Sequence, residues 1–175
     1  MASPGCVFCD FGNVLAFFDH VKAARQLAAL ARPRIDTQLV FDRVFSTSLE
    51  ERYDSGRMST ADFIGALRAE LGLQATDEEI ARAWNDIYAP NEAMLEVMAS
   101  LESTGVRLLL ASNTNELHYG WFRPLFAQTL DLFDAEVLSF RVGCRKPDRR
   151  FYDACLEAAG VPMSDCLYID DREDL

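Results

Sequence analysis

The sequence predicts an α/β protein with a Rossmann-like parallel sheet, helices on both of its faces, and an inserted all-helical cap. Short apolar runs that end in polar or acidic residues occur near the start, the middle and the end of the chain. From residue 107 onward such runs alternate with helical patterns, which is typical of parallel sheets. Residues 19–88, between the first two runs, show helical spacing and no strand pattern.

The first predicted strand is Cys6–Cys9, and the carboxylate of Asp10 follows it directly. Open α/β sheets bind ligands at the carboxyl ends of their strands, so Asp10 is a candidate site residue. The two cysteines are three positions apart and should point to opposite faces of the sheet, which predicts packing rather than a metal or redox pair. Five scattered cysteines also predict that the chain has no disulfide framework.

The inserted segment is predicted to consist of helices. Apolar residues at helical spacing predict one helix over 19–31 and another over 35–45. Residues 46–55 are polar and end at Gly56, and no separate helix is assigned to them. Ser59 and Thr76 are then expected to begin two further helices as N-cap residues. A right-handed crossover needs only one helix, so the rest should be an insertion that covers the site.

The chain is therefore expected to divide into a core, residues 1–18 and 89–175, and a helical cap, residues 19–88. Because the chain ends at Leu175, directly after the last predicted strand, the final strand region of the fold is expected to be missing. After the cap, the expected elements are helix 91–103, strand 107–111, helix 115–129, strand 135–139, helix 148–159 and strand 166–169.

Polar residues follow several of the predicted strands. Ser112 follows the second strand, Asp170 and Asp171 follow the last one, and Lys146 lies in the loop before the last crossover helix. In a parallel sheet these strand ends share one edge, so they should meet Asp10 there. A nucleophilic carboxylate, a hydroxyl, an ammonium group and paired acids together suit phosphoryl transfer.

These segments resemble, in order, the four motifs of the haloacid dehalogenase-type hydrolase superfamily. Their residues are most similar to those of the α-D-glucose-1-phosphate phosphatase branch, and the insertion resembles the helical cap of subfamily I phosphatases. The resemblance implies a phosphoric monoester hydrolase whose cap closes over small substrates. The matching segments are Asp10-Phe-Gly-Asn-Val-Leu, Ser112-Asn-Thr-Asn, Arg145-Lys146-Pro147 and Asp170-Asp171.

The resemblance also implies roles for these residues. Asp10 would be the nucleophile that forms an aspartyl-phosphate, with Ser112 and Lys146 as further catalytic residues. Mg²⁺ prefers carboxylate and carbonyl oxygens, and two adjacent buried acids repel each other unless a cation is present. The expected metal residues are Asp10, the carbonyl of Gly12, Asp171 and, less directly, Asp170. The residues expected to hold the phosphate are Gly12, Asn13, Ser112, Asn113, Thr114 and Lys146.

Gly12 departs from the pattern of most phosphatases in the superfamily, which carry a second Asp there as general acid and base. Such a proton donor contributes about 10²–10⁴-fold to the rate. The branch that this sequence resembles shares the Gly-Asn pattern, so activity is still expected. Without a donor, the acidity of the leaving group should decide the rate, which favours sugar 1-phosphates and aryl phosphates over phosphates of primary alcohols.

Composition excludes several other classes. A net charge of −11 argues against nucleic acid and anionic membranes as partners. With only His20 and His118, a zinc or iron site built on histidines is excluded, and His118 is expected either to reach the mouth of the site or to pack. No apolar run approaches the ~20 residues of a membrane span, and the N-terminus lacks a signal-peptide pattern. We expect a cytoplasmic monomer or homodimer.

The expected function is that of a Mg²⁺-dependent phosphatase acting on a small phosphorylated metabolite, with sugar 1-phosphate favoured. One alternative is a non-catalytic module that binds a phosphorylated ligand, motivated by Gly12 and by the early end of the chain. Another is a metal-independent haloacid dehalogenase, in which Asp10 would attack carbon. The paired acids Asp170 and Asp171, together with Lys146, argue against this second alternative.

Overall fold

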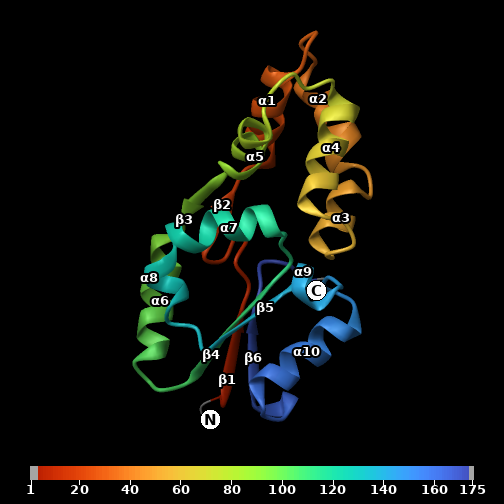
Figure 1. Cartoon of the computed structure of the whole chain (residues 1–175). Helices are drawn as coiled ribbons and strands as arrows, with labels where there is room; N and C mark the ends of the chain where they lie inside the picture. Colours follow the sequence, from red (N-terminus) through yellow and green to blue (C-terminus); the bar gives the residue numbers. More distant parts are fainter. Residues whose placement is uncertain (1–3, 174–175) are drawn as a thin grey trace.

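The computed structural model describes residues 4–173. Its centre is a four-stranded parallel sheet with the strand order β5-β4-β1-β6 (Figure 1). All the pairings in this sheet are parallel, so the carboxyl ends of its strands lie at one edge, which we call the carboxyl edge. The predicted α/β class is confirmed. The strands are β1 (Cys6–Cys9), β4 (Arg107–Ser112), β5 (Ala135–Leu138) and β6 (Cys166–Ile169).

Helices cover both faces of the sheet (Figure 1). Successive residues of β1 point to opposite faces, so Cys6 packs in one cluster with Phe151, whereas Cys9 packs in the other with Phe122. The predicted separation of the two cysteines is thus confirmed, and all five cysteines are free. The covering helices are α10 (Arg149–Ala159) on the first face, and α6 (Glu92–Glu102), α7 (Glu116–Leu125) and α8 (Ala127–Leu130) on the second.

A second group of helices lies beyond the carboxyl edge and forms the upper part of Figure 1. We call residues 20–85 the cap. The cap has its own core, in which Trp84, Tyr53 and Phe63 are buried. Two short antiparallel strands, β2 (Ala16–Phe18) and β3 (Tyr88–Pro90), connect it to the sheet. Its helices are α1 (His20–Leu30), α2 (Thr37–Val40), the π-helix η1 (Phe41–Phe45), α3 (Leu49–Asp54), α4 (Thr60–Leu71) and α5 (Asp77–Asn85).

One helix that matters for the site was not assigned from the sequence. Residues 46–55, which were described only as polar, contain the helix α3. Leu49 and Tyr53 are four positions apart and both are buried in the core of the cap, so this helix is held by tertiary packing. Three charged residues stand between Leu49 and Tyr53, so the helical spacing of these two apolar residues was not recognised in the sequence.

Three boundaries also differ from prediction. The expected helix 35–45 changes from α to π geometry at Phe41, and the expected helix 115–129 is divided between α7 and α8 at Phe126. Strand β3 begins at Tyr88, inside the segment that was expected to be all helical. Its pairing with β2 gives backbone partners to the two connections between cap and sheet.

Helices of the cap also touch the rest of the molecule. Helix α3 contacts α9 (Ser139–Val142), which follows β5, and α5 contacts α7. At the second contact the rings of Trp84 and His118 stack with centroids 5.0 Å apart. Both contacts bring the cap close to the carboxyl edge. Within residues 4–173, no helix combines the length and apolarity that crossing a membrane requires.

Candidate active site

Asp10 and Lys146 form the centre of the site. The backbone N–H of Asp10 donates to the carbonyl of Ile169 (2.9 Å), which ties the end of β1 to β6. The Nζ atom of Lys146 lies 3.2 Å from Asp10 Oδ1 and 2.6 Å from Asp170 Oδ2. Burial raises the pKa of Asp10 to about 6, while Lys146 opposes this shift and Asp170 adds to it. The lysine is therefore fixed between two carboxylates.

Three carboxylates converge at this point. Oxygen atoms of Asp10, Asp170 and Asp171 lie within 4.8 Å of one another. Asp10 Oδ1 is buried and, although near Lys146, accepts no hydrogen bond from the residues that the structure describes. Asp170 is already engaged, because Lys146 and the backbone N–H of Arg172 bind its two oxygens. The donor set fits Mg²⁺, with Asp10 and Asp171 as the available carboxylates and Asp170 as support.

The turn after Asp10 explains the glycine. The left-handed backbone conformation falls on Asn13 (φ 54°) and not on Gly12. Asn13 also donates from Nδ2 to Asp171 Oδ2 (3.1 Å), which joins the turn to the fourth motif. A Cβ atom at Gly12 would lie 2.8 Å from Cε1 of Phe18, so the aromatic ring occupies the space that a side chain would need. Gly12 is therefore required by close packing.

The second motif supports the third. Ser112 ends β4 and is buried. The side chain of Asn113 exchanges two hydrogen bonds with the backbone of Lys146, accepting from its N–H (2.8 Å) and donating to its carbonyl (3.2 Å). The backbone N–H of Thr114, expected to face a phosphate, instead donates to Ser139 Oγ (2.8 Å). In this structure that amide supports the edge and is not directed at a ligand.

A cavity of about 210 Å³ lies over the carboxyl edge. It is lined by every residue predicted for the site except Asp170, which lies behind Lys146. His118, for which two roles were expected, is buried against Trp84 and does not line the cavity. The predicted residues that line it are Asp10, Gly12, Asn13, Ser112, Asn113, Thr114, Lys146 and Asp171.

The cap supplies further lining residues that were not predicted, His20, Glu50 and Asp54. Glu50 and Asp54 belong to α3, in the segment to which no separate helix was assigned. The signal that could have revealed them is the spacing of four between Leu49 and Tyr53, which places the two acids one turn apart on one helix.

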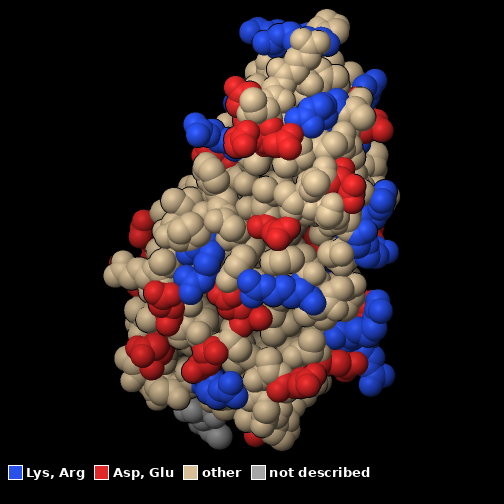
Figure 2. All heavy atoms as spheres, in the orientation of Figure 1, with Lys and Arg blue, Asp and Glu red and all other residues tan. Residues whose placement is uncertain are grey.

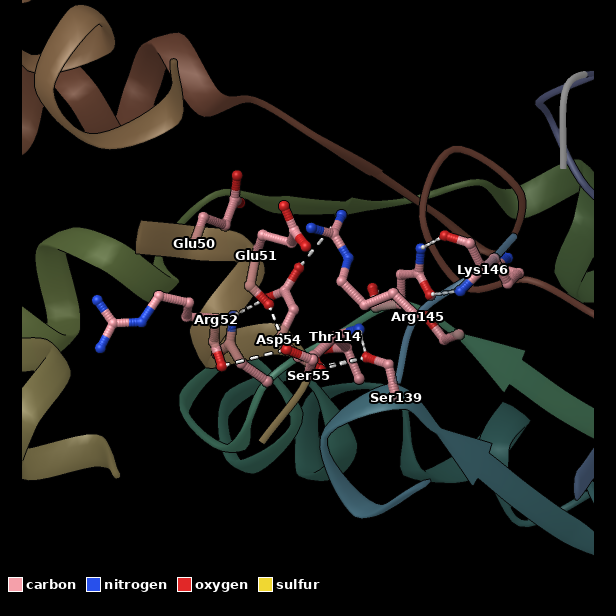
Figure 3. A network of polar contacts seen from close by, with 12 residues as sticks. Glu50, Glu51, Arg52, Asp54, Ser55, Thr114, Ser139, Arg145 and Lys146 are labelled. Atoms are coloured by element: carbon pink, nitrogen blue, oxygen red, sulfur yellow. Dashed lines mark hydrogen bonds and ion pairs between the residues drawn. The ribbon is translucent and has the colours of Figure 1, made fainter. Parts of the chain in front are cut away.

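A polar network joins Asp54 to the carboxyl edge (Figure 3). Asp54 Oδ1 accepts from Asn115 Nδ2 (2.8 Å), and its Oδ2 lies 3.6 Å from Nη2 of Arg145. The hydroxyl of Ser139, at the end of β5, donates to the backbone carbonyl of Asp54 (2.6 Å). Helix α3 is thus attached to residues that flank the second and third motifs.

Acidic and basic side chains are interspersed over the face shown in Figure 2, and the chain as a whole carries a net charge of −11. An anionic ligand therefore depends on positive groups inside the cavity. The cationic residues that line it are Arg145, Lys146 and Arg172. The same lining also holds the acids Asp10, Glu50, Asp54 and Asp171, so these three cations alone do not make the cavity positive.

Comparisons with known proteins show which family this chain resembles. A family model described as haloacid dehalogenase-like hydrolase matches residues 5–174. D-ribitol-5-phosphate phosphatase of Bacteroides thetaiotaomicron is 29% identical, and the match covers 93% of this chain and 80% of that protein. A phosphatase of Mycobacterium tuberculosis is 30% identical, with coverage of 98% and 81%.

A solved structure shares the fold. It is a haloacid dehalogenase family enzyme of Bacteroides thetaiotaomicron in complex with magnesium and inorganic phosphate. It matches this chain with a TM-score of 0.83 at 23% identity, covering 98% of this chain and 86% of that one. The matched residues of the family model include all four motifs and the cap. The chain therefore belongs to the haloacid dehalogenase-like hydrolase family.

Proposed function

We propose that this protein is a Mg²⁺-dependent phosphatase that hydrolyses a small phosphorylated metabolite through an aspartyl-phosphate on Asp10. The observation that carries the proposal is the position of Asp10 in the cavity, beside Lys146 and within 4.8 Å of two further carboxylates. Relatives named as phosphatases support it.

Each residue of the carboxyl edge has a role in this reaction. The carboxylate of Asp10 attacks phosphorus, and water hydrolyses the resulting acyl phosphate in a second step. Lys146, which Asp170 holds in place, and Ser112 neutralise or donate to the phosphoryl oxygens. Asp10, Asp171 and the carbonyl of Gly12 would hold Mg²⁺, whose chemistry here is to neutralise the charge of the phosphate.

The proposed substrate is a phosphorylated sugar or polyol. The cavity of about 210 Å³ is suited to a small ligand. Sugar 1-phosphates stay the first choice because their anomeric leaving group is more acidic than an ordinary alcohol. The name of one relative, D-ribitol-5-phosphate phosphatase, adds pentitol phosphates to the compounds worth testing.

The two alternatives fit the geometry less well. A module that only binds a phosphorylated ligand has no need for a buried carboxylate placed beside a buried lysine. In a metal-independent dehalogenase, three carboxylates would converge without a metal ion between them, with Lys146 close to two of the three. Three converging carboxylates are better explained by a divalent cation.

The test is a screen of sugar and polyol phosphates with wild type and Asp10→Asn, with Mg²⁺ and with EDTA. Wild type should release phosphate only with Mg²⁺, and Asp10→Asn should lose on the order of 10⁴-fold or more in kcat, because the nucleophile is removed. Circular dichroism should show that the variant is folded. Retained turnover in folded Asp10→Asn would refute the assignment of the nucleophile.

A further inference from the structure

A leaving alcohol needs a proton when its bond to phosphorus breaks, and a positioned donor contributes about 10²–10⁴-fold to the rate. The acids at the carboxyl edge have other roles: Asp10 attacks, Asp170 holds Lys146, and Asp171 suits the cation. Phe18 fills the space where a side chain at Gly12 would lie. A proton donor therefore has to come from the other residues that line the cavity, and the acids among them, Glu50 and Asp54, lie on the cap side.

Glu50 lies on that side. It lines the same cavity as Asp10, and its side chain is 19% exposed. Helix α3 places Glu50 one turn before Asp54, and Figure 3 shows Asp54 turned toward Arg145. Glu50 itself lies 3.6 Å from Nε2 of His20, which is longer than a hydrogen bond. Its carboxyl group is thus not committed to a strong partner among the described residues.

The surroundings of Glu50 favour its neutral form. Burial raises the pKa of Glu50 to about 8, and the charge of Asp54 acts in the same direction, while Arg145 opposes it. Burial lowers the pKa of His20 and raises that of Tyr88 far above its usual value, so both are uncharged near neutral pH. Because His20 and Tyr88 carry no charge, they do not counter the increase that Asp54 causes in the pKa of Glu50.

The proton belongs to Glu50 and not to Asp54. Burial also raises the pKa of Asp54, but Arg145 and the amide of Asn115 both stabilise its charged form. Glu50 has no comparable donor among the described residues. Two buried acids one turn apart share their charge unequally, and Asp54, which has the hydrogen bond from Asn115 and the nearby guanidinium of Arg145, is the carboxylate.

We propose that Glu50 is the general acid and base of this enzyme and takes the place of the residue that is absent at Gly12. This rests on the phosphatase function proposed above. As Asp10 bonds to phosphorus and the bond between phosphorus and the leaving oxygen breaks, the Glu50 carboxyl gives its proton to that oxygen. In the second step the attacking water gives a proton to the Glu50 carboxylate, and the hydroxide that remains bonds to phosphorus. The bond between Asp10 and phosphorus then breaks, which releases HPO₄²⁻ and regenerates the Asp10 carboxylate.

The experiment compares two leaving groups. Wild type and Glu50→Gln are assayed with Mg²⁺ on phenyl phosphate, whose phenol has a pKa of about 10, and on the primary-alcohol phosphate that wild type hydrolyses fastest. Glu50→Gln should lower kcat/KM for the alkyl phosphate by ~10²–10⁴-fold and for phenyl phosphate by about tenfold or less. The matched control is Glu51→Gln on the same helix, which pairs with exposed Arg57 and should leave both values unchanged.

A second measurement needs no variant. In wild type, kcat/KM for the alkyl phosphate should fall above about pH 8 as Glu50 loses its proton, and that for phenyl phosphate should fall much less. Equal losses for both substrates in Glu50→Gln, or identical pH profiles in wild type, would overturn the inference and leave the phosphatase function intact. If wild type hydrolysed phenyl phosphate but no primary-alcohol phosphate, the inference about Glu50 would also be overturned while the phosphatase function stood. Wild type that hydrolyses no phosphate ester would overturn both.

Discussion

The cavity has two walls of different origin. One wall is the carboxyl edge, where Ser112 ends a strand of the parallel sheet and Asp10 and Asp171 come just after two others. The other is the cap, where Glu50 and Asp54 lie on α3. The edge follows from one rule, that parallel strands end on the same side, whereas the cap wall depends on contacts between segments far apart in sequence. We infer that the edge carries out the phosphoryl transfer proposed above and that the cap supplies the groups that act on the leaving alcohol.

Among the variants that test this difference between the two walls, the largest loss of activity is expected for a proposed metal ligand of the edge. Asp171→Ala should abolish Mg²⁺ binding and activity together, because Asp171 is the available carboxylate beside Asp10. Asp170→Asn should weaken Mg²⁺ affinity by only about 10–100-fold, as is typical of a residue that supports ligands. Isothermal titration with Mg²⁺ measures both. If Asp171→Ala bound Mg²⁺ as wild type does, the metal site would have to lie elsewhere.

An intermediate effect is expected where the cap wall is attached to the edge. Asp54→Ala removes the acceptor of Asn115 and the partner of Arg145, and leaving a buried donor unpaired costs about 1–3 kcal/mol of unfolding free energy. Urea unfolding followed by circular dichroism measures it. Glu51→Ala is the control, since its exposed ion pair with Arg57 is worth about 0.2–1 kcal/mol. Equal losses in the two variants would mean that Asp54 does not anchor the cap.

The same contrast explains how far the sequence could be interpreted. Strand β1 and Asp10 were predicted because an apolar run followed by an acid has a fixed meaning in a parallel sheet. Helix α3 was not, because its two buried residues stand among charged ones and only their packing in the cap reveals the helix. Phe18 packs against Gly12 through a chain reversal between β1 and β2, so the reason for this glycine also required the structure.

The last prediction concerns the contact between cap and core that takes no part in the chemistry. His118 of α7 is buried, stacks on Trp84 of α5 and meets the ring of Tyr88 edge-on. Burial lowers the pKa of His118 from 6.5 to about 3, and His20 acts in the same direction. Below pH 6.5 the unfolded chain therefore binds a proton that the folded chain does not, so folding stability falls as the pH decreases from 6.5 toward 3.

His118→Phe keeps an aromatic ring against Trp84 and removes this titration. Between pH 7 and pH 5 wild type should lose about 2 kcal/mol more unfolding free energy than the variant, because 1.4 kcal/mol corresponds to one pH unit below the unfolded pKa. Urea unfolding at pH 7, 6 and 5 gives the two curves, and the carboxylates that also titrate there are common to both proteins. Parallel curves would show that His118 takes up its proton in the folded state as readily as in the unfolded chain. Burial between Trp84 and Tyr88 would then not hold the imidazole neutral, and this account of the contact would be wrong.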